Sequence, residues 1–112
     1  MRTCVLIPAY NEATRIGAVI RGARSYVDEV IVIVDGGTDD TATVARQEGA
    51  RVIVHGENCG AGAATMTGFL VARSLNVDAV ITIDADGQHA TSDIPRLLAV
   101  LETEHADLVI AN

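Results

Sequence analysis

The chain has 112 residues, which suits a single domain, and 49% of them are apolar, so a core covered on two sides can form. Aromatic residues make up only 3%, so Val, Ile, Leu and Ala must build that core. The net charge of −7 argues against nucleic acid or an anionic membrane surface as the main partner.

Strand-like and helix-like segments alternate along the whole chain. Short apolar runs rich in β-branched residues predict strands over residues 4–7, 30–34, 51–54, 79–83 and 107–110. Apolar residues at helical spacing predict helices over 12–24, from a cap at Thr38 or Asp39 to Glu48, over 63–75 and over 94–104. Pro8 is expected to end the first strand, and Pro95 to lie in the first turn of the last helix. This order predicts an α/β fold with a parallel sheet and right-handed crossovers.

The two cysteines and the first residues of the chain bear on its location. Cys4 and Cys59 lack the spacing of metal ligands and are expected to be reduced thiols. The apolar stretch that follows Met1 is far too short for a signal peptide or a membrane helix. We therefore expect a cytoplasmic protein with no transmembrane segment in this chain.

Three polar loops follow predicted strands: residues 8–12, 35–41 and 84–89. In a parallel sheet they gather at the carboxyl edge, where open α/β sheets bind ligands. In the third loop, Asp84 and Asp86 follow a buried strand, and Gly87 lets the backbone bend so that their oxygens converge. Such hard oxygen ligands suit Mg²⁺ or Mn²⁺. The competing interpretation is an ordinary surface turn.

Two other nucleotide-binding motifs can be compared with the sequence. Gly60-Ala61-Gly62 could belong to a dinucleotide-binding Rossmann domain, but Thr65 stands where a third glycine is needed, and five residues separate Val54 from Gly60. A P-loop is excluded because the chain contains no lysine. A non-catalytic nucleotide-binding module remains an alternative.

Four segments in order resemble the successive motifs of family 2 glycosyltransferases: residues 8–12, 34–41, 58–64 and 84–89. The last of them, Asp-Ala-Asp-Gly-Gln-His, is most similar to the polyprenyl-phosphate sugar transferases, which resemble dolichol-phosphate mannosyltransferase. The resemblance implies a GT-A fold, which is a Rossmann-like three-layer sandwich with a mostly parallel sheet. It also implies a GDP- or UDP-linked sugar as donor, Mg²⁺ or Mn²⁺ as cofactor, and a polyprenyl phosphate as an acceptor. Such an acceptor would bring the protein to the cytoplasmic face of a membrane.

The first two motifs carry the expected nucleoside contacts. By resemblance, Pro8, Tyr10 and Glu12 match positions that hold the base and ribose, and Asp35 matches an acid that contacts the nucleoside. Chemically, a tyrosine ring can stack on a base and a carboxylate can accept from ribose hydroxyls. The plainer alternatives are a partly buried core aromatic for Tyr10, a first-turn helix acid for Glu12 and a turn residue for Asp35.

The last motif carries the expected diphosphate and metal contacts. By resemblance, Asp84, Ala85 and Asp86 lie against the donor, and Asp84, Asp86 and Gln88 surround the cation. No catalytic base can be assigned from the sequence.

Three features depart from the family pattern. The second motif is one residue shorter than the usual Asp-Asp-Gly-Ser-Thr-Asp, and Ala61 stands where a lysine is frequent. Family members also continue beyond the position of Asn112 into a half that carries the acceptor site. We therefore expect residues 1–112 to be a donor-binding domain truncated on its acceptor side. In isolation it would transfer no sugar, and its uncovered strand edge would favour self-association.

Overall fold

The computed structural model describes the chain except for residues 1, 57–59, 86–89, 105–107 and 111–112. Strands and helices alternate throughout, as predicted. The elements are β1 (Thr3–Ala9), α1 (Ile16–Arg24), β2 (Glu29–Asp35), α2 (Thr41–Gln47), β3 (Arg51–His55), α3 (Ala61–Ser74), β4 (Ala79–Thr82), α4 (Ala90–Glu104) and β5 (Leu108–Ile110).

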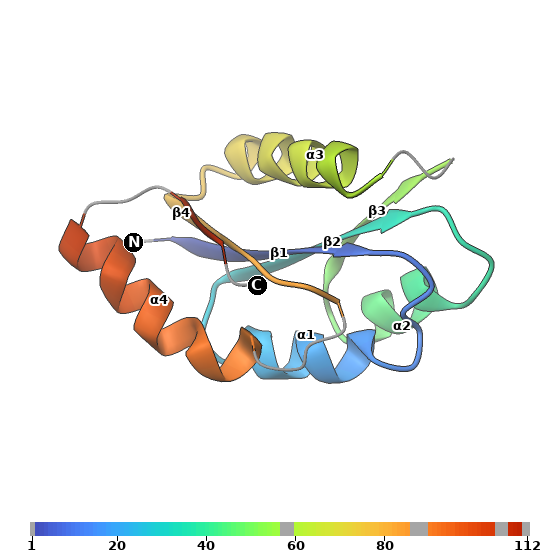
Figure 1. Cartoon of the computed structure of the whole chain (residues 1–112), viewed down its shortest axis with the longest axis horizontal. Coiled ribbons are helices and arrows are strands. Elements are labelled where there is room, and N and C mark those ends of the chain that lie inside the picture. Colours follow the sequence, from blue (N-terminus) through green and yellow to red (C-terminus); the bar gives the residue numbers. More distant parts are fainter. Residues whose placement is uncertain (1, 57–59, 86–89, 105–107, 111–112) are drawn as a thin grey trace.

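The strands form a single sheet in the order β3-β2-β1-β4-β5, and every neighbouring pair is parallel. Helix α3 covers one face, while α1, α2 and α4 lie on the other (Figure 1). The predicted α/β three-layer sandwich with a parallel sheet is therefore confirmed. The order also shows that the chain first winds outward from β1 through β2 to β3, and then returns to the other side of β1 with β4.

The period-two alternation of the strands divides the core into two parts. Val5, Ile7, Val32 and Ile81 face the three-helix side. On the opposite side, residues of β1, β2 and α3 form a smaller cluster: Cys4, Leu6, Ile31, Ile33, Ala64 and Ala72. Strands β1 and β2 are buried along both faces, which explains their continuous apolar sequences.

Helix α3 approaches β1 closely because Gly68 has no side chain. A Cβ atom on Gly68 would collide with the side chain of Leu6, so any larger residue would push the helix away from the sheet. This contact fixes how deeply α3 packs over the central strands.

The first strand continues through Pro8, contrary to our prediction. Pro8 lies in the register of the β1–β2 ladder, opposite Ile33. The reason is that Leu6 directs its carbonyl towards β4, where it accepts from Ile83 N at 3.1 Å. Pro8 lies two residues further along and faces the same side, beyond the last β1–β4 pair at Leu6 and Thr82. Its missing N–H therefore costs no hydrogen bond with β2.

The helix starts also differ from the predictions. Helix α2 begins at Thr41, with Asp40 and neither Thr38 nor Asp39 at the capping position. Helix α1 begins at Ile16, four residues later than expected, because Asn11 has a positive φ of 51° and residues 12–16 form a turn closed by Glu12 O. Helix α3 begins at Ala61, two residues early. Helix α4 begins at Ala90, so Pro95 lies inside the helix and not in its first turn. There the ring removes one N–H from the helical ladder.

Within the described ranges, no helix is both long enough and apolar enough to span a bilayer. Cys4 is a free, fully buried thiol, and burial raises its pKa to about 12. Cys59 lies outside the described residues.

Candidate functional site

The carboxyl ends of all five strands lie at one edge of the sheet, and the winding direction changes between β1 and β4. The carboxyl side of such a switch point is where open α/β sheets bind ligands. The loop after β1 and the residues after β4 flank this point. Four of the predicted contact residues, Tyr10, Glu12, Asp84 and Ala85, come from these two segments.

The β1–α1 loop presents an aromatic ring and a carboxylate. Tyr10 is 45% exposed, which rules out its interpretation as a core aromatic. Glu12 is partly buried and lies four residues before α1, so it is not a first-turn helix acid. Its Oε2 lies 2.9 Å from Arg15 Nε, an ionic contact in which this shielded oxygen accepts no hydrogen bond. Pro8 is partly buried at the end of β1.

Side chains tie this loop to the loop that follows β2. The Thr38 N–H donates to Asn11 Oδ1 at 3.0 Å, and the Glu12 N–H donates to Thr41 Oγ1 at 2.9 Å. The Ala13 N–H donates to Asp39 Oδ2 at 3.1 Å. The two loops are thus one hydrogen-bonded unit, which holds Glu12 in a fixed place relative to β2.

Asp39 also organises the start of α2, although the capping position itself is that of Asp40. Its Oδ1 accepts from the Thr41 N–H at 3.0 Å and from the Thr41 hydroxyl. These bonds favour the ionised carboxylate, and the hydroxyl of Thr41 is the main cause that lowers the pKa of Asp39 below its usual value.

Asp35 ends β2 and is only 4% exposed. Its Oδ1 lies 3.2 Å from Nδ1 of His55, the last residue of β3, and its Oδ2 accepts from the Gly60 N–H at 2.7 Å. The Nε2 atom of His55 lies 2.8 Å from Thr67 Oγ1 on α3. Sequence reasoning missed His55 and Thr67. The signal was present, because a histidine at the carboxyl end of a predicted strand belongs to the same sheet edge.

Asp84 and Ala85 follow β4 at the same edge. Asp84 is exposed and Ala85 is buried. Asp86 and Gln88, the other predicted metal contacts, lie outside the described residues. Among the residues that are described, no three His, Cys, Asp or Glu side chains are grouped to hold a metal ion. An exposed carboxylate at the end of a strand is nonetheless the kind of hard oxygen donor that Mg²⁺ and Mn²⁺ bind.

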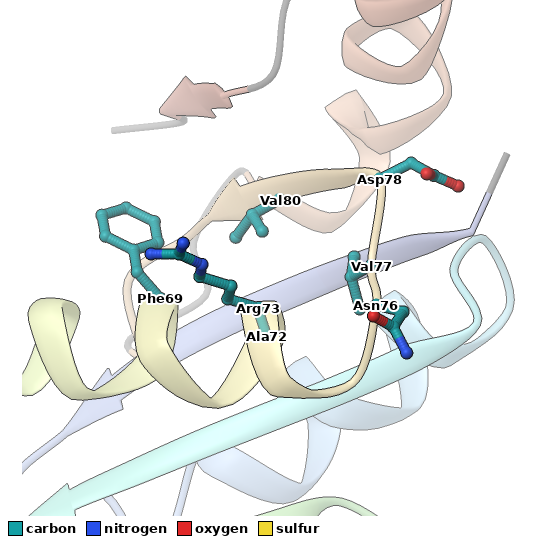
Figure 2. A pocket seen from close by; sticks show the side chains of 7 residues that line it. All are labelled: Phe69, Ala72, Arg73, Asn76, Val77, Asp78 and Val80. Carbon is teal, nitrogen blue, oxygen red and sulfur yellow. The ribbon is translucent and has the colours of Figure 1, made fainter.

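An open groove of about 650 Å³ lies elsewhere, between the carboxyl-terminal half of α3 and β4. Figure 2 shows Phe69 and Arg73 of α3 beside Val80, with Asn76, Val77 and Asp78 at the turn that precedes β4. This turn lies at the amino edge of the sheet. The groove is therefore separate from the residues predicted to bind a donor.

The parallel sheet and the polar loops at its switch point define an open α/β domain of the class that binds ligands at the carboxyl edge. The chain belongs to glycosyl transferase family 2, whose family model matches residues 4–112. The predicted family and the GT-A type of fold are thereby confirmed.

Curated relatives include enzymes that act on lipid phosphates. The chain is 30% identical over 126 residues to UDP-N-acetylglucosamine–dolichyl-phosphate N-acetylglucosaminyltransferase of Methanococcus voltae, an alignment that covers 96% of this chain and 50% of the relative. It is 32% identical over 119 residues to undecaprenyl-phosphate mannosyltransferase of Micrococcus luteus, covering 100% of this chain and 48% of that one. The chain thus spans about half the length of these relatives.

Solved structures show the same fold. Glucosyl-3-phosphoglycerate synthase from Mycobacterium tuberculosis, in complex with Mn²⁺, UDP and glucosyl-3-phosphoglycerate, is 33% identical with a TM-score of 0.69; the match covers 89% of this chain and 39% of that one. Mannosyl-3-phosphoglycerate synthase from Rubrobacter xylanophilus has a TM-score of 0.77 at 24% identity, with 90% of this chain and 36% of that one covered. The second likeness concerns the fold alone.

Proposed function

We propose that this chain is the donor-binding part of a glycosyltransferase that moves a sugar from a nucleoside diphosphate to a polyprenyl phosphate. The observation that carries the proposal is the linked pair of loops after β1 and β2, which presents Tyr10 and Glu12 beside the switch point of the sheet. Family membership and the lipid-phosphate acceptors of two curated relatives support the choice of reaction.

In this proposal, the nucleoside is bound along the β1 and β2 side. The exposed ring of Tyr10 stacks on the base, and the carboxylate of Glu12 accepts from ribose hydroxyls. Asp35, at the end of β2, contacts the nucleoside. Pro8, at the end of β1, forms part of the wall beside the base and ribose. UDP is favoured over GDP as the nucleotide, because solved relatives bind UDP.

The diphosphate is bound on the β4 side, next to Asp84 and Ala85. Asp84, Asp86 and Gln88 would hold a divalent cation, with Mn²⁺ favoured over Mg²⁺ by the complexes of the relatives. When bound, that cation supplies charge to neutralise the leaving nucleoside diphosphate. The chain's own residues could do little of this, because its eight basic residues are outnumbered by fifteen acidic ones.

The transfer inverts the anomeric carbon. An acceptor oxygen forms a new bond to that carbon as the bond to the diphosphate oxygen breaks, and the nucleoside diphosphate leaves with both electrons. A phosphate acceptor is already anionic at neutral pH, so it needs little help from a base. Donor binding at the cytoplasmic face of a membrane is the setting that fits such an acceptor.

Calorimetry with UDP and GDP tests the donor site. We expect UDP to bind in the presence of Mn²⁺ and to bind more weakly when EDTA replaces the metal. Equal affinity with EDTA would contradict the metal-dependent site, and tighter binding of NAD than of either diphosphate would favour a dinucleotide-binding domain.

A further inference from the structure

Three side chains from three elements, β2, β3 and α3, meet near the carboxyl edge of the sheet. Asp35 and His55 are register partners at the ends of β2 and β3, so both side chains project from the same face of the sheet. That face is the one covered by α3, because Ile31 and Ile33 precede Asp35 in alternation and pack in the α3 cluster. Thr67 on α3 completes the group by its 2.8 Å contact with His55 Nε2.

The donor and acceptor roles in this group follow from its geometry. Oδ2 of Asp35 accepts from the Gly60 N–H at 2.7 Å, while Oδ1 faces His55 Nδ1 at 3.2 Å. A carboxylate accepts at both oxygens, so Nδ1 of His55 carries the proton. In the neutral ring Nε2 is then the acceptor, and the hydroxyl of Thr67 donates to it. The structure assigns the Nδ1–H tautomer to His55.

The bonds also fix the residue that precedes α3, Gly60, relative to the end of β2. Gly60 has φ 93° and ψ 160°, a conformation that L-residues rarely adopt, and it directs its N–H at Asp35. The carboxylate thus joins the end of β2, the end of β3 and the first residue before α3. A side chain that holds a buried carboxylate in one orientation preorganises the ligand contacts of that carboxylate and of the Gly60 backbone.

We propose that His55 and Thr67 are positioning residues, which hold Asp35 and the Gly60 backbone in the geometry that the nucleoside requires. This inference rests on the proposed function for its ligand. His55 acts through Asp35, so it needs no contact with the nucleotide.

Two substitutions at one position separate this role from a merely structural one. In His55→Asn the amide nitrogen can replace Nδ1 and still donate to Asp35, whereas in His55→Gln the amide reaches the place of Nε2 and keeps only Thr67. We expect H55Q to weaken UDP binding about tenfold, the loss typical of a hydrogen bond to a charged group, and H55N to stay within about threefold of the wild type. The loss of UDP affinity in Thr67→Val should lie between those of the two His55 variants. Its matched control is Thr43→Val, on the exposed side of α2, which should bind UDP like the wild type.

Thermal unfolding of each variant and NMR of the histidine ring nitrogens complete the experiment. The wild-type spectrum should show His55 protonated at Nδ1, and the Gly60 amide signal should move in H55Q but not in H55N. Affinity losses that are equal in H55N and H55Q, losses that merely follow the melting temperature, or an Nε2–H tautomer would each overturn the inference. If H55Q does not fold, the UDP affinity of H55N and the His55 tautomer of the wild type decide whether the inference holds. If the wild type binds neither UDP nor GDP, the proposed function fails, and the ring tautomer and Gly60 signal alone decide the positioning role.

Discussion

Asp39 accepts a hydrogen bond from the backbone N–H of Ala13 at 3.1 Å, and this bond joins the loop after β2 to the loop after β1. The same carboxylate accepts from the backbone and hydroxyl of Thr41 at the start of α2. The ionised carboxylate of Asp39 therefore connects the two loops that form the proposed nucleoside site.

The first prediction concerns pH. The bonds from Thr41 lower the pKa of Asp39 in the folded chain, so its contribution to stability is present above the ordinary aspartate pKa of about 3.9 and is lost as the pH falls through the lower folded value. Asp39→Asn should therefore be less stable than the wild type at pH 7, and the difference should shrink below about pH 4. Melting temperatures from pH 3 to 7 measure this, with Asp40→Asn as control, because Asp40 makes no capping bond. A difference that does not change with pH would contradict the assignment.

The second prediction concerns packing between α3 and β1. Gly68→Ala should destabilise the fold by about 1–3 kcal/mol, the usual cost of overpacking, because the new methyl group would collide with Leu6. Gly62→Ala in the same helix is the control, since a Cβ there meets nothing within 4 Å, and it should be neutral or stabilising by about 0.5–1 kcal/mol. Denaturant unfolding compares the two. Equal stability of both variants would mean that α3 lies further from the sheet.

The third prediction concerns Glu12. Glu12→Ala should cost about 1–3 kcal/mol of UDP affinity, the range for a lost hydrogen bond to a charged group, with a much smaller change in melting temperature. Glu48→Ala is the matched control, because Glu48 is similarly exposed and also paired with an arginine, Arg21, but lies at the amino edge of the sheet. A collapse of stability with normal affinity of the folded molecules would show that Glu12 has a structural role only.

The fourth prediction concerns the β4 side. Asp84→Asn should reduce the dependence of UDP binding on Mn²⁺ without loss of stability, because Asp84 is exposed. We expect Asp86→Asn to have the larger effect on affinity. Asp78→Asn, an exposed acid at the opposite end of β4, should leave the metal dependence unchanged. Calorimetry with and without Mn²⁺ measures the UDP affinity of all three variants. An unchanged metal dependence in D84N would show that Asp84 does not bind the metal.

The fifth prediction concerns Cys4. Burial raises its thiol pKa to about 12, so almost no thiolate exists at pH 8 in the folded chain. In a Cys59→Ser variant, iodoacetamide should leave the native protein unlabelled and should label it fully in denaturant. Labelling of the native protein at the rate of a free thiol would contradict the packing of β1.

The sequence predicted the order of elements because each strand is a short apolar run and most helices have clear apolar spacing. It failed at Pro8, since the cost of a proline in a strand depends on which neighbour its nitrogen faces, and that is a property of the sheet. It also could not pair Asp35 with His55 or His55 with Thr67. These residues are 20 and 12 positions apart, and only the strand register and the approach of α3 bring them together.

The place of β1 has a consequence for synthesis of the protein. Of the five strands described, it is translated first, yet it lies in the middle of their order, and its second neighbour begins only at Ala79. The Asp78 N–H donates to Arg2 O at 2.8 Å, so the two ends of this pairing lie 76 residues apart in sequence. On the ribosome, β1 can pair with β2 early, but one edge of it stays open until β4 emerges. This late closure leaves the apolar β1 in need of protection while the residues between β2 and β4 are translated.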